Sequence, residues 1–152
     1  MPNLFFARRR HSTAAGLAMS VVTAVFGFAK ASTAHAQSIR LEIAEKYSSA
    51  THDPSRIWPD KDLKPFGASP KRSGADITEY SAPTADGSRW LLSQILSEDC
   101  SLRLCPARLA KISQNGQATI LVDDMMHIGG PFIIDGDMLK NGDYQFHIGT
   151  AK

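Results

Sequence analysis

The fold is indicated most strongly by residues 90–113, WLLSQILSEDCSLRLCPARLAKIS. Two stretches rich in apolar residues, Trp90–Ser97 and Ala107–Ser113, flank a short segment that is bounded by Cys100 and Cys105. Short apolar runs on either side of a tight connection are typical of two antiparallel strands. We therefore expect a hairpin whose tip is tied by a disulfide between the two cysteines.

The sequence on both sides of this hairpin also reads as short strands joined by tight turns. Dipeptides that favour the positive φ angles of hairpin turns occur at Asp86-Gly87, Asn115-Gly116, Asp135-Gly136 and Asn141-Gly142. Further candidate strands are Ile77–Thr84, Gln117–Asp124, Phe132–Asp135 and Tyr144–Ile148. In the last of these, Tyr144, Phe146 and Ile148 alternate with polar residues and are expected to point inward. Residues 76–152 are thus predicted to form a twisted antiparallel meander sheet of five to six strands.

Residues 37–75 are expected to be an N-terminal helix followed by a Pro-rich irregular segment. In Ser38–Ala50, Ile39, Ile43 and Tyr47 recur at helical spacing, although Ile39, Leu41 and Ile43 also alternate as in a strand. The Ala-Glu-Lys continuation favours the helix. Prolines then recur every five or six residues, at Pro54, Pro59, Pro65 and Pro70, and exclude long regular structure. Trp58 and Phe66 either pin this segment to the sheet or belong to a solvated linker. The expected class is α+β, mainly β, with one helix packed on the sheet.

Residues 1–36 have the three parts of a cleavable signal peptide. Arg8–Arg10 supply positive charge, Ser12–Ala29 is uncharged and apolar, and Ala34-His35-Ala36 places small residues at a cleavage site. Cleavage would leave Gln37 first, and we expect a periplasmic or secreted protein. An uncleaved membrane anchor is the alternative, because 18 apolar residues approach the length needed to span a bilayer. The arginines also leave the Sec and twin-arginine export routes open.

Removal of the leader changes the charge balance. The 152-residue chain has 17 basic and 15 acidic residues, but four of the basic ones precede Gln37, so the remaining chain has a net charge of −2. No basic patch remains to favour nucleic acid, and no polybasic run remains to favour stable membrane association after cleavage.

Cys100 and Cys105 are the only cysteines, and an even count in an exported chain favours a disulfide. A redox pair usually has two residues between its thiols, whereas here there are four. A zinc site would need two further ligands at matching spacing. We therefore expect a structural disulfide that fixes the loop Ser101–Leu104.

This loop is the predicted partner-binding site, through Leu102, Arg103 and Leu104. Aliphatic side chains beside an arginine suit a protein interface, although the leucines could instead fold back onto the core. The Cys-x-x-x-x-Cys loop in an exported domain of this size resembles the periplasmic inhibitors of vertebrate lysozyme, and the resemblance covers only Cys100–Cys105. It implies a loop that inserts into another protein's active site. The family loop uses a histidine and an acid, whereas this loop has Ser101, Leu102, Arg103 and Leu104.

Other chemistry is weakly indicated. The cluster Asp123-Asp124-Met125-Met126-His127 suggests a copper or zinc site formed by Asp123, His127 and His147, the alternative being a strand end whose methionines fill the core. No catalytic motif occurs, so an enzyme is not favoured and no cofactor is expected. The sequence predicts an exported binding or inhibitor-like module whose partner is another envelope or extracellular protein.

Overall fold

The computed structural model describes residues 38–65 and 73–149. The predicted signal peptide, residues 1–36, lies outside the described residues, as does Phe66. No helix within 38–65 or 73–149 has both the length and the apolar character to cross a membrane.

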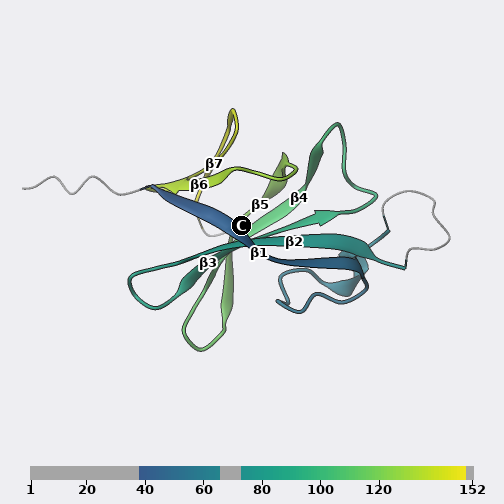
Figure 1. Cartoon of the computed structure of the whole chain (residues 1–152), viewed down its shortest axis with the longest axis horizontal. Coiled ribbons are helices and arrows are strands. Elements are labelled where there is room, and N and C mark those ends of the chain that lie inside the picture. The colour runs from purple at the N-terminus through teal and green to yellow at the C-terminus, as the bar shows by residue number, and fades with distance from the viewer. Residues whose placement is uncertain (1–37, 66–72, 150–152) are drawn as a thin grey trace, which may run out of the picture. The chain divides into compact units, whose positions relative to one another are not determined.

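The described residues form a mainly β structure built on one antiparallel sheet (Figure 1). The strands are β1 (Ile39–Ala50), β2 (Ala75–Pro83), β3 (Arg89–Leu96), β4 (Leu104–Ile112), β5 (Ala118–His127), β6 (Phe132–Asp135), β7 (Met138–Asn141) and β8 (Tyr144–His147). Their order across the sheet is β5-β4-β3-β2-β1-β6-β7-β8. A single 3-10 turn, Asp60–Asp62, is the helical structure in these residues.

The sheet curls until its two outer strands nearly meet, which makes it almost a barrel. The Gly149 N–H, just after β8, donates to the Leu121 carbonyl of β5 over 3.3 Å. Further along β5, the His127 ring lies 5.1 Å from the Tyr144 ring of β8. The antiparallel sheet is confirmed, but it has eight strands in the described residues rather than five or six.

The turns that the sequence predicted connect neighbouring strands. Asp86-Gly87 joins β2 to β3, Asn115-Gly116 joins β4 to β5, and the last two dipeptides bound β7. Gly116, for example, has φ of 81°. Strand β7 was not predicted, because it has only four residues and includes Asn141, a residue type that is typical of turns.

The predicted N-terminal helix is wrong, because Ile39–Ala50 is strand β1. Its first residues, Ile39–Leu41, pair with β6, and the rest of the strand pairs with β2. The backbone donors and acceptors of β1 are therefore satisfied by two neighbouring strands, which outweighs a weak local preference for helix. The helical spacing of Ile39, Ile43 and Tyr47 was coincidental, and the Ile39–Leu41–Ile43 alternation was the informative pattern.

The concave face of the sheet holds the larger hydrophobic core. Tyr80, Leu92, Leu109 and Phe132 are among its buried residues, and Tyr80 packs edge-on against Phe132 with 4.8 Å between ring centroids. Phe146 and Ile148 of the C-terminal segment pack on this core, as predicted, but Tyr144 is exposed.

The other face of β2, β3 and β4 is covered by the irregular segment 51–63. Ile57, Trp58 and Leu63 are buried there, which excludes a solvated linker for this part of the chain. The Asp53 carboxylate accepts hydrogen bonds from the backbone N–H groups of Ser55, Ile57 and Trp58. These bonds replace the regular structure that the prolines prevent.

Trp58 and Arg108 fasten this cover to the sheet. The Trp58 indole N–H donates to the Ser93 hydroxyl of β3 over 2.9 Å. The guanidinium of Arg108, on β4, lies 4.2 Å from the centre of the indole ring and donates to the Ile57 carbonyl over 3.0 Å. Arg108 therefore holds the covering segment through two contacts, a cation–π contact with Trp58 and a hydrogen bond to the Ile57 carbonyl.

Candidate functional site

The β3–β4 connection is closed by the predicted disulfide. Cys100 and Cys105 are joined, with their Cα atoms 4.3 Å apart. The next residues toward the tip, Ser101 and Leu104, form two backbone hydrogen bonds with each other. The Ser101 N–H donates to the Leu104 carbonyl over 2.8 Å, and the Leu104 N–H donates to the Ser101 carbonyl over 2.7 Å. The tip is therefore a two-residue hairpin turn whose central residues are Leu102 and Arg103.

Both central residues adopt the left-handed backbone conformation. Leu102 has φ of 44° and Arg103 has φ of 76°. Positive φ at both positions is the geometry of a type I′ turn, which strongly favours Asn-Gly. For a residue with a large side chain this conformation costs about 1–2 kcal/mol. Leu102 and Arg103 therefore raise the free energy of the folded turn, because neither is a residue type that this turn favours.

The side chain at the apex projects into solvent. Leu102 is 96% exposed, whereas Leu104 is half-buried at the start of β4. The alternative that the leucines fold back onto the core thus applies only in part to Leu104. An exposed leucine on a strained, cross-linked turn is not explained by packing.

The connection between β5 and β6 lies beside the turn and adds further exposed apolar surface. The Ile128 N–H donates to the Arg103 carbonyl over 3.0 Å, and the Ile128 side chain is 51% exposed. His127 precedes it and contacts Tyr144. We call Leu102, Arg103, Ile128, His127 and Tyr144 the tip surface.

A hollow of about 360 Å³ lies within the tip surface. Its lining includes Arg103, His127, Asn141 and Asp143. The buried Asn141 side chain accepts a hydrogen bond from the His127 N–H over 2.6 Å, which fixes the β5 end against β7. The hollow thus presents one cation and one carboxylate beside a single apolar side chain, Ile128.

The structure does not bring Asp123, His127 and His147 together as a metal site. Asp123 accepts a hydrogen bond from the Arg108 guanidinium over 3.0 Å, and His147 lies 3.0 Å from the Asp137 carboxylate. Across residues 38–65 and 73–149, no group of three or more His, Cys, Asp or Glu side chains is placed to hold a metal ion.

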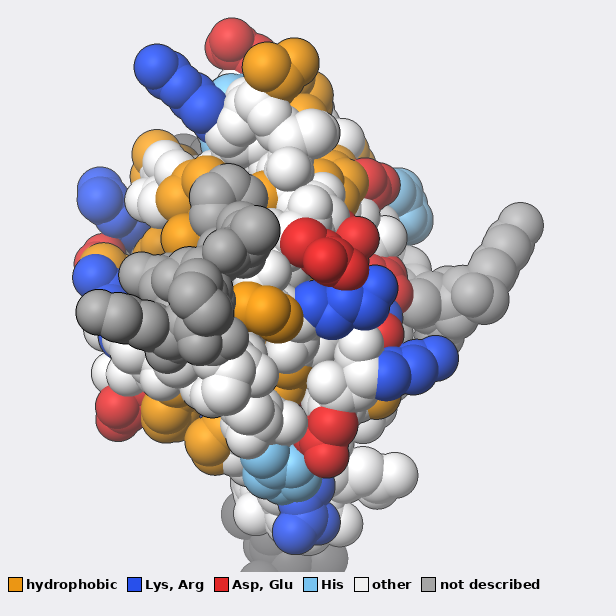
Figure 2. All heavy atoms as spheres, turned by 90° about the vertical axis from the view of Figure 1, so that its right-hand side faces the viewer, with side chains coloured by type: hydrophobic (Ala, Val, Ile, Leu, Met, Phe, Trp, Pro, Cys, Tyr) orange, Lys and Arg blue, Asp and Glu red, His pale blue; other side chains and the backbone are white. Residues whose placement is uncertain are grey.

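Charges are mixed over the surface. The face in Figure 2 shows basic and acidic side chains interspersed with apolar ones rather than one continuous basic area. Much of this charge is paired, as in the Lys64–Glu98 and Lys111–Asp86 ion pairs at 3.0 and 2.8 Å. The carboxyl pKa of Asp86 is held far below its usual range by hydrogen bonds from Lys111, Ser88 and Thr84.

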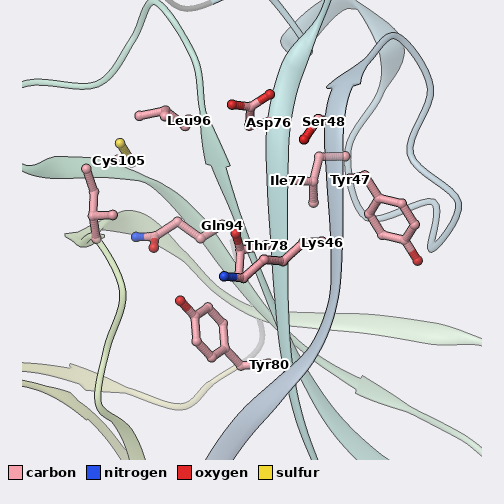
Figure 3. Close-up of a pocket in the computed structure, with 11 residues that line it drawn as sticks. Lys46, Tyr47, Ser48, Asp76, Ile77, Thr78, Tyr80, Gln94, Leu96 and Cys105 are labelled. Atoms are coloured by element: carbon pink, nitrogen blue, oxygen red, sulfur yellow. The ribbon is translucent and has the colours of Figure 1, made fainter.

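A second feature, which was not predicted from the sequence, is a pocket of about 230 Å³ on the concave face beside the base of the tip (Figure 3). Its floor is a row of register partners, Lys46 on β1, Thr78 on β2 and Gln94 on β3. Leu96, Cys105 and Ile128 also line it. No sequence signal marks this pocket, because it depends on the register of three strands.

The pocket lies beside a part of β1 with which the short strand β6 does not pair. β6 pairs with β1 only over Ile39–Leu41, so β6 leaves the remainder of β1 without a partner on that side. Gln94 supports the far side of the pocket by donating to the Met126 and His127 carbonyls and accepting from the Gly129 N–H. The concave face is thus filled by core residues at one end and open at the other.

Comparison with known proteins gives no match at the level of family models, curated proteins or solved structures. The tip surface and the pocket are therefore the two features of this protein that point to a function.

Proposed function

We propose that the protein is an exported binding module that contacts another envelope or extracellular protein through the tip surface, in the manner of an inhibitor loop. The observation that carries the proposal is the pair Leu102-Arg103, which occupies a costly backbone conformation while Leu102 is almost fully exposed. Backbone strain that persists in a folded protein clusters at functional positions. An aliphatic residue and an arginine on a pre-formed loop are suitable interface anchors.

The disulfide supports the same proposal. It holds the turn in one shape before a partner arrives, which reduces the ordering cost of association. A disulfide is also compatible with an oxidising compartment. Export is supported further by the sequence of residues 1–36.

The test is capture of envelope or extracellular proteins by the disulfide-bonded protein, compared with Leu102→Ser and Arg103→Ala. Both variants are expected to fold with unchanged circular dichroism, because neither side chain packs in a core. Each should lose the partner that the native protein retains. Ile43→Ser is the matched control, since Ile43 is 57% exposed and lies outside the tip surface. Equal capture by the native protein and both tip variants would refute the proposal.

Export has a separate test. The intact mass of the protein from the cell envelope is measured with and without reductant before alkylation. It should match a chain that begins at Gln37, and alkylation should detect no free thiol until the protein is reduced. A full-length mass with two free thiols would contradict the export part.

A further inference from the structure

We propose that the 230 Å³ pocket on the concave face binds a small organic acid, whose carboxylate contacts Lys46, Thr78 and Tyr80 and whose apolar part packs on Leu96 and Ile128. Pockets that bind small molecules combine apolar walls with a few convergent polar groups. Its volume is below the roughly 300–1,000 Å³ of sites for drug-sized ligands, so a small acid fits it better than a large one.

The polar groups converge from neighbouring strands. Lys46 and Thr78 are register partners, so their side chains leave the sheet next to each other on the same face. Tyr80 is two residues further along β2 and shares that face. Figure 3 shows the Lys46 side chain extending across β2 toward Thr78 and Gln94, while Tyr47 points to the other side of the sheet.

These groups have unused binding capacity. Within residues 38–65 and 73–149, the side chains of Lys46, Thr78 and Tyr80 form no hydrogen bond or ion pair with the protein. Tyr80 is nevertheless buried, and burial raises the pKa of its hydroxyl, which therefore stays protonated at neutral pH and can donate. A cation beside two hydroxyl donors is a suitable arrangement for a carboxylate.

The pocket also contains the carboxylate of Asp76, which lies away from the place proposed for the carboxylate of the ligand. Asp76 is on the same face of β2 as Thr78 and Tyr80, with Thr78 between it and Tyr80. Its carboxylate accepts a hydrogen bond from the Ser49 N–H over 2.9 Å. The carboxylate of a ligand is therefore placed at the Tyr80 end, and its apolar part lies against Leu96, Cys105 and Ile128.

The experiment is a titration of the full folded protein, with its disulfide intact, by benzoate and by hexanoate, followed by amide chemical shifts in NMR spectra. At least one acid should bind at millimolar concentrations and shift the amides of Lys46, Thr78, Tyr80 and Gln94. Benzamide, which has the shape of benzoate but no charge, should bind more weakly by about tenfold, the loss expected for one charge-assisted hydrogen bond.

Lys46→Met should weaken binding of the acid by about tenfold and leave the fold intact, because Lys46 is exposed. Lys61→Met makes the same charge change at another exposed lysine and should have no effect. The proposal is overturned if neither acid shifts the pocket amides at tens of millimolar, if benzamide binds as well as benzoate, or if the two lysine variants bind alike. Tip variants should not alter this titration, so its failure is distinguishable from failure of the proposed function.

Discussion

The two ends of strand β4 solve the same geometric problem in different ways. At the β4–β5 end, Asn115-Gly116 makes the turn, and Gly116 adopts φ of 81° without a side chain to oppose it. At the β3–β4 end, Leu102 and Arg103 both have positive φ, and the Cys100–Cys105 disulfide closes the turn behind them. The first end uses the residues that the backbone prefers. The second retains residues that the backbone disfavours, and a covalent link holds them in place.

This difference separates a turn that serves folding from a turn that presents side chains. Replacement of a favourable turn residue should destabilise the first end, whereas relief of the unfavourable conformation should stabilise the second. The first two predictions below test this contrast, and two more test other parts of the molecule, in order from the largest expected change in stability to the smallest.

Loss of the disulfide should have the largest effect. Cys100→Ser with Cys105→Ser removes a short covalent loop, and the free energy of unfolding should fall by about 2 kcal/mol. Urea denaturation followed by circular dichroism measures this change. The amide spectrum should show the largest shifts at 101–104, because the turn loses the link that holds it. An unchanged free energy of unfolding and unchanged amide chemical shifts at 101–104 would mean that the turn keeps its conformation without the disulfide.

Gly116→Ala tests the opposite end of β4. A Cβ at this position meets no atom within 4 Å, so only the backbone conformation opposes the substitution. The free energy of unfolding should fall by about 1 kcal/mol, measured by urea denaturation. Partner capture should be unaffected. A neutral result would remove the argument that positive φ is costly in this fold, and the interpretation of Leu102-Arg103 would weaken with it.

Glu79 offers a change in stability that involves neither end of β4. It is 2% exposed on β2, and one of its carboxylate oxygens has no hydrogen-bond partner in the described residues. Burial is the main cause that raises its pKa. A carboxyl group with a raised folded-state pKa binds its proton more tightly when folded, so stability falls as pH rises from the unfolded-state pKa through the folded-state pKa.

Glu79→Gln should therefore raise the melting temperature at pH 7, with a gain of about 0.5 kcal/mol at the low end of single-substitution effects. The loss of stability as pH rises above the ordinary value of 4.5 for this carboxyl group should also become smaller. Thermal melts of both proteins across this range measure the effect, and the tip should bind as before. A Glu79→Gln variant that is less stable at pH 7, with the same dependence of stability on pH as the native protein, would contradict the inference that the buried Glu79 carboxylate is destabilising.

Metal ions should have the smallest effect. Because Asp123 and His147 have other partners, added Cu²⁺ or Zn²⁺ should produce no chelator-reversible shift in melting temperature. A shift that His127→Ala and His147→Ala each abolish would instead show that these two histidines, from β5 and β8, share a metal ion.

The sequence was most informative where local chemistry decides the structure. Dipeptides such as Asn115-Gly116 identified the turns, and the spacing of Cys100 and Cys105 identified the hairpin tip. It was misleading for β1, because a helical spacing of three apolar residues coincided with a strand whose stability comes from β2 and β6. The covering role of Trp58 was one of two open alternatives, since it depends on Ser93 and Arg108 far along the chain.

The candidate sites divide in the same way. The residues at the tip could be named from the sequence, but their positive φ angles could not, because Leu and Arg normally avoid that conformation. The pocket could not be predicted at all. It requires the register that places Lys46 beside Thr78 and Gln94, and a neighbouring strand that stops pairing at Leu41.

The central claim is that Leu102 and Arg103 are retained at a cost to stability because their side chains bind a partner. The most direct measurement is urea denaturation of Leu102→Asn with Arg103→Gly, which installs the preferred turn sequence inside the intact disulfide, together with partner capture by the same variant. We predict that the free energy of unfolding rises by about 1–2 kcal/mol while capture is lost. A variant that is no more stable than the native protein, or that captures the partner equally well, would contradict the claim.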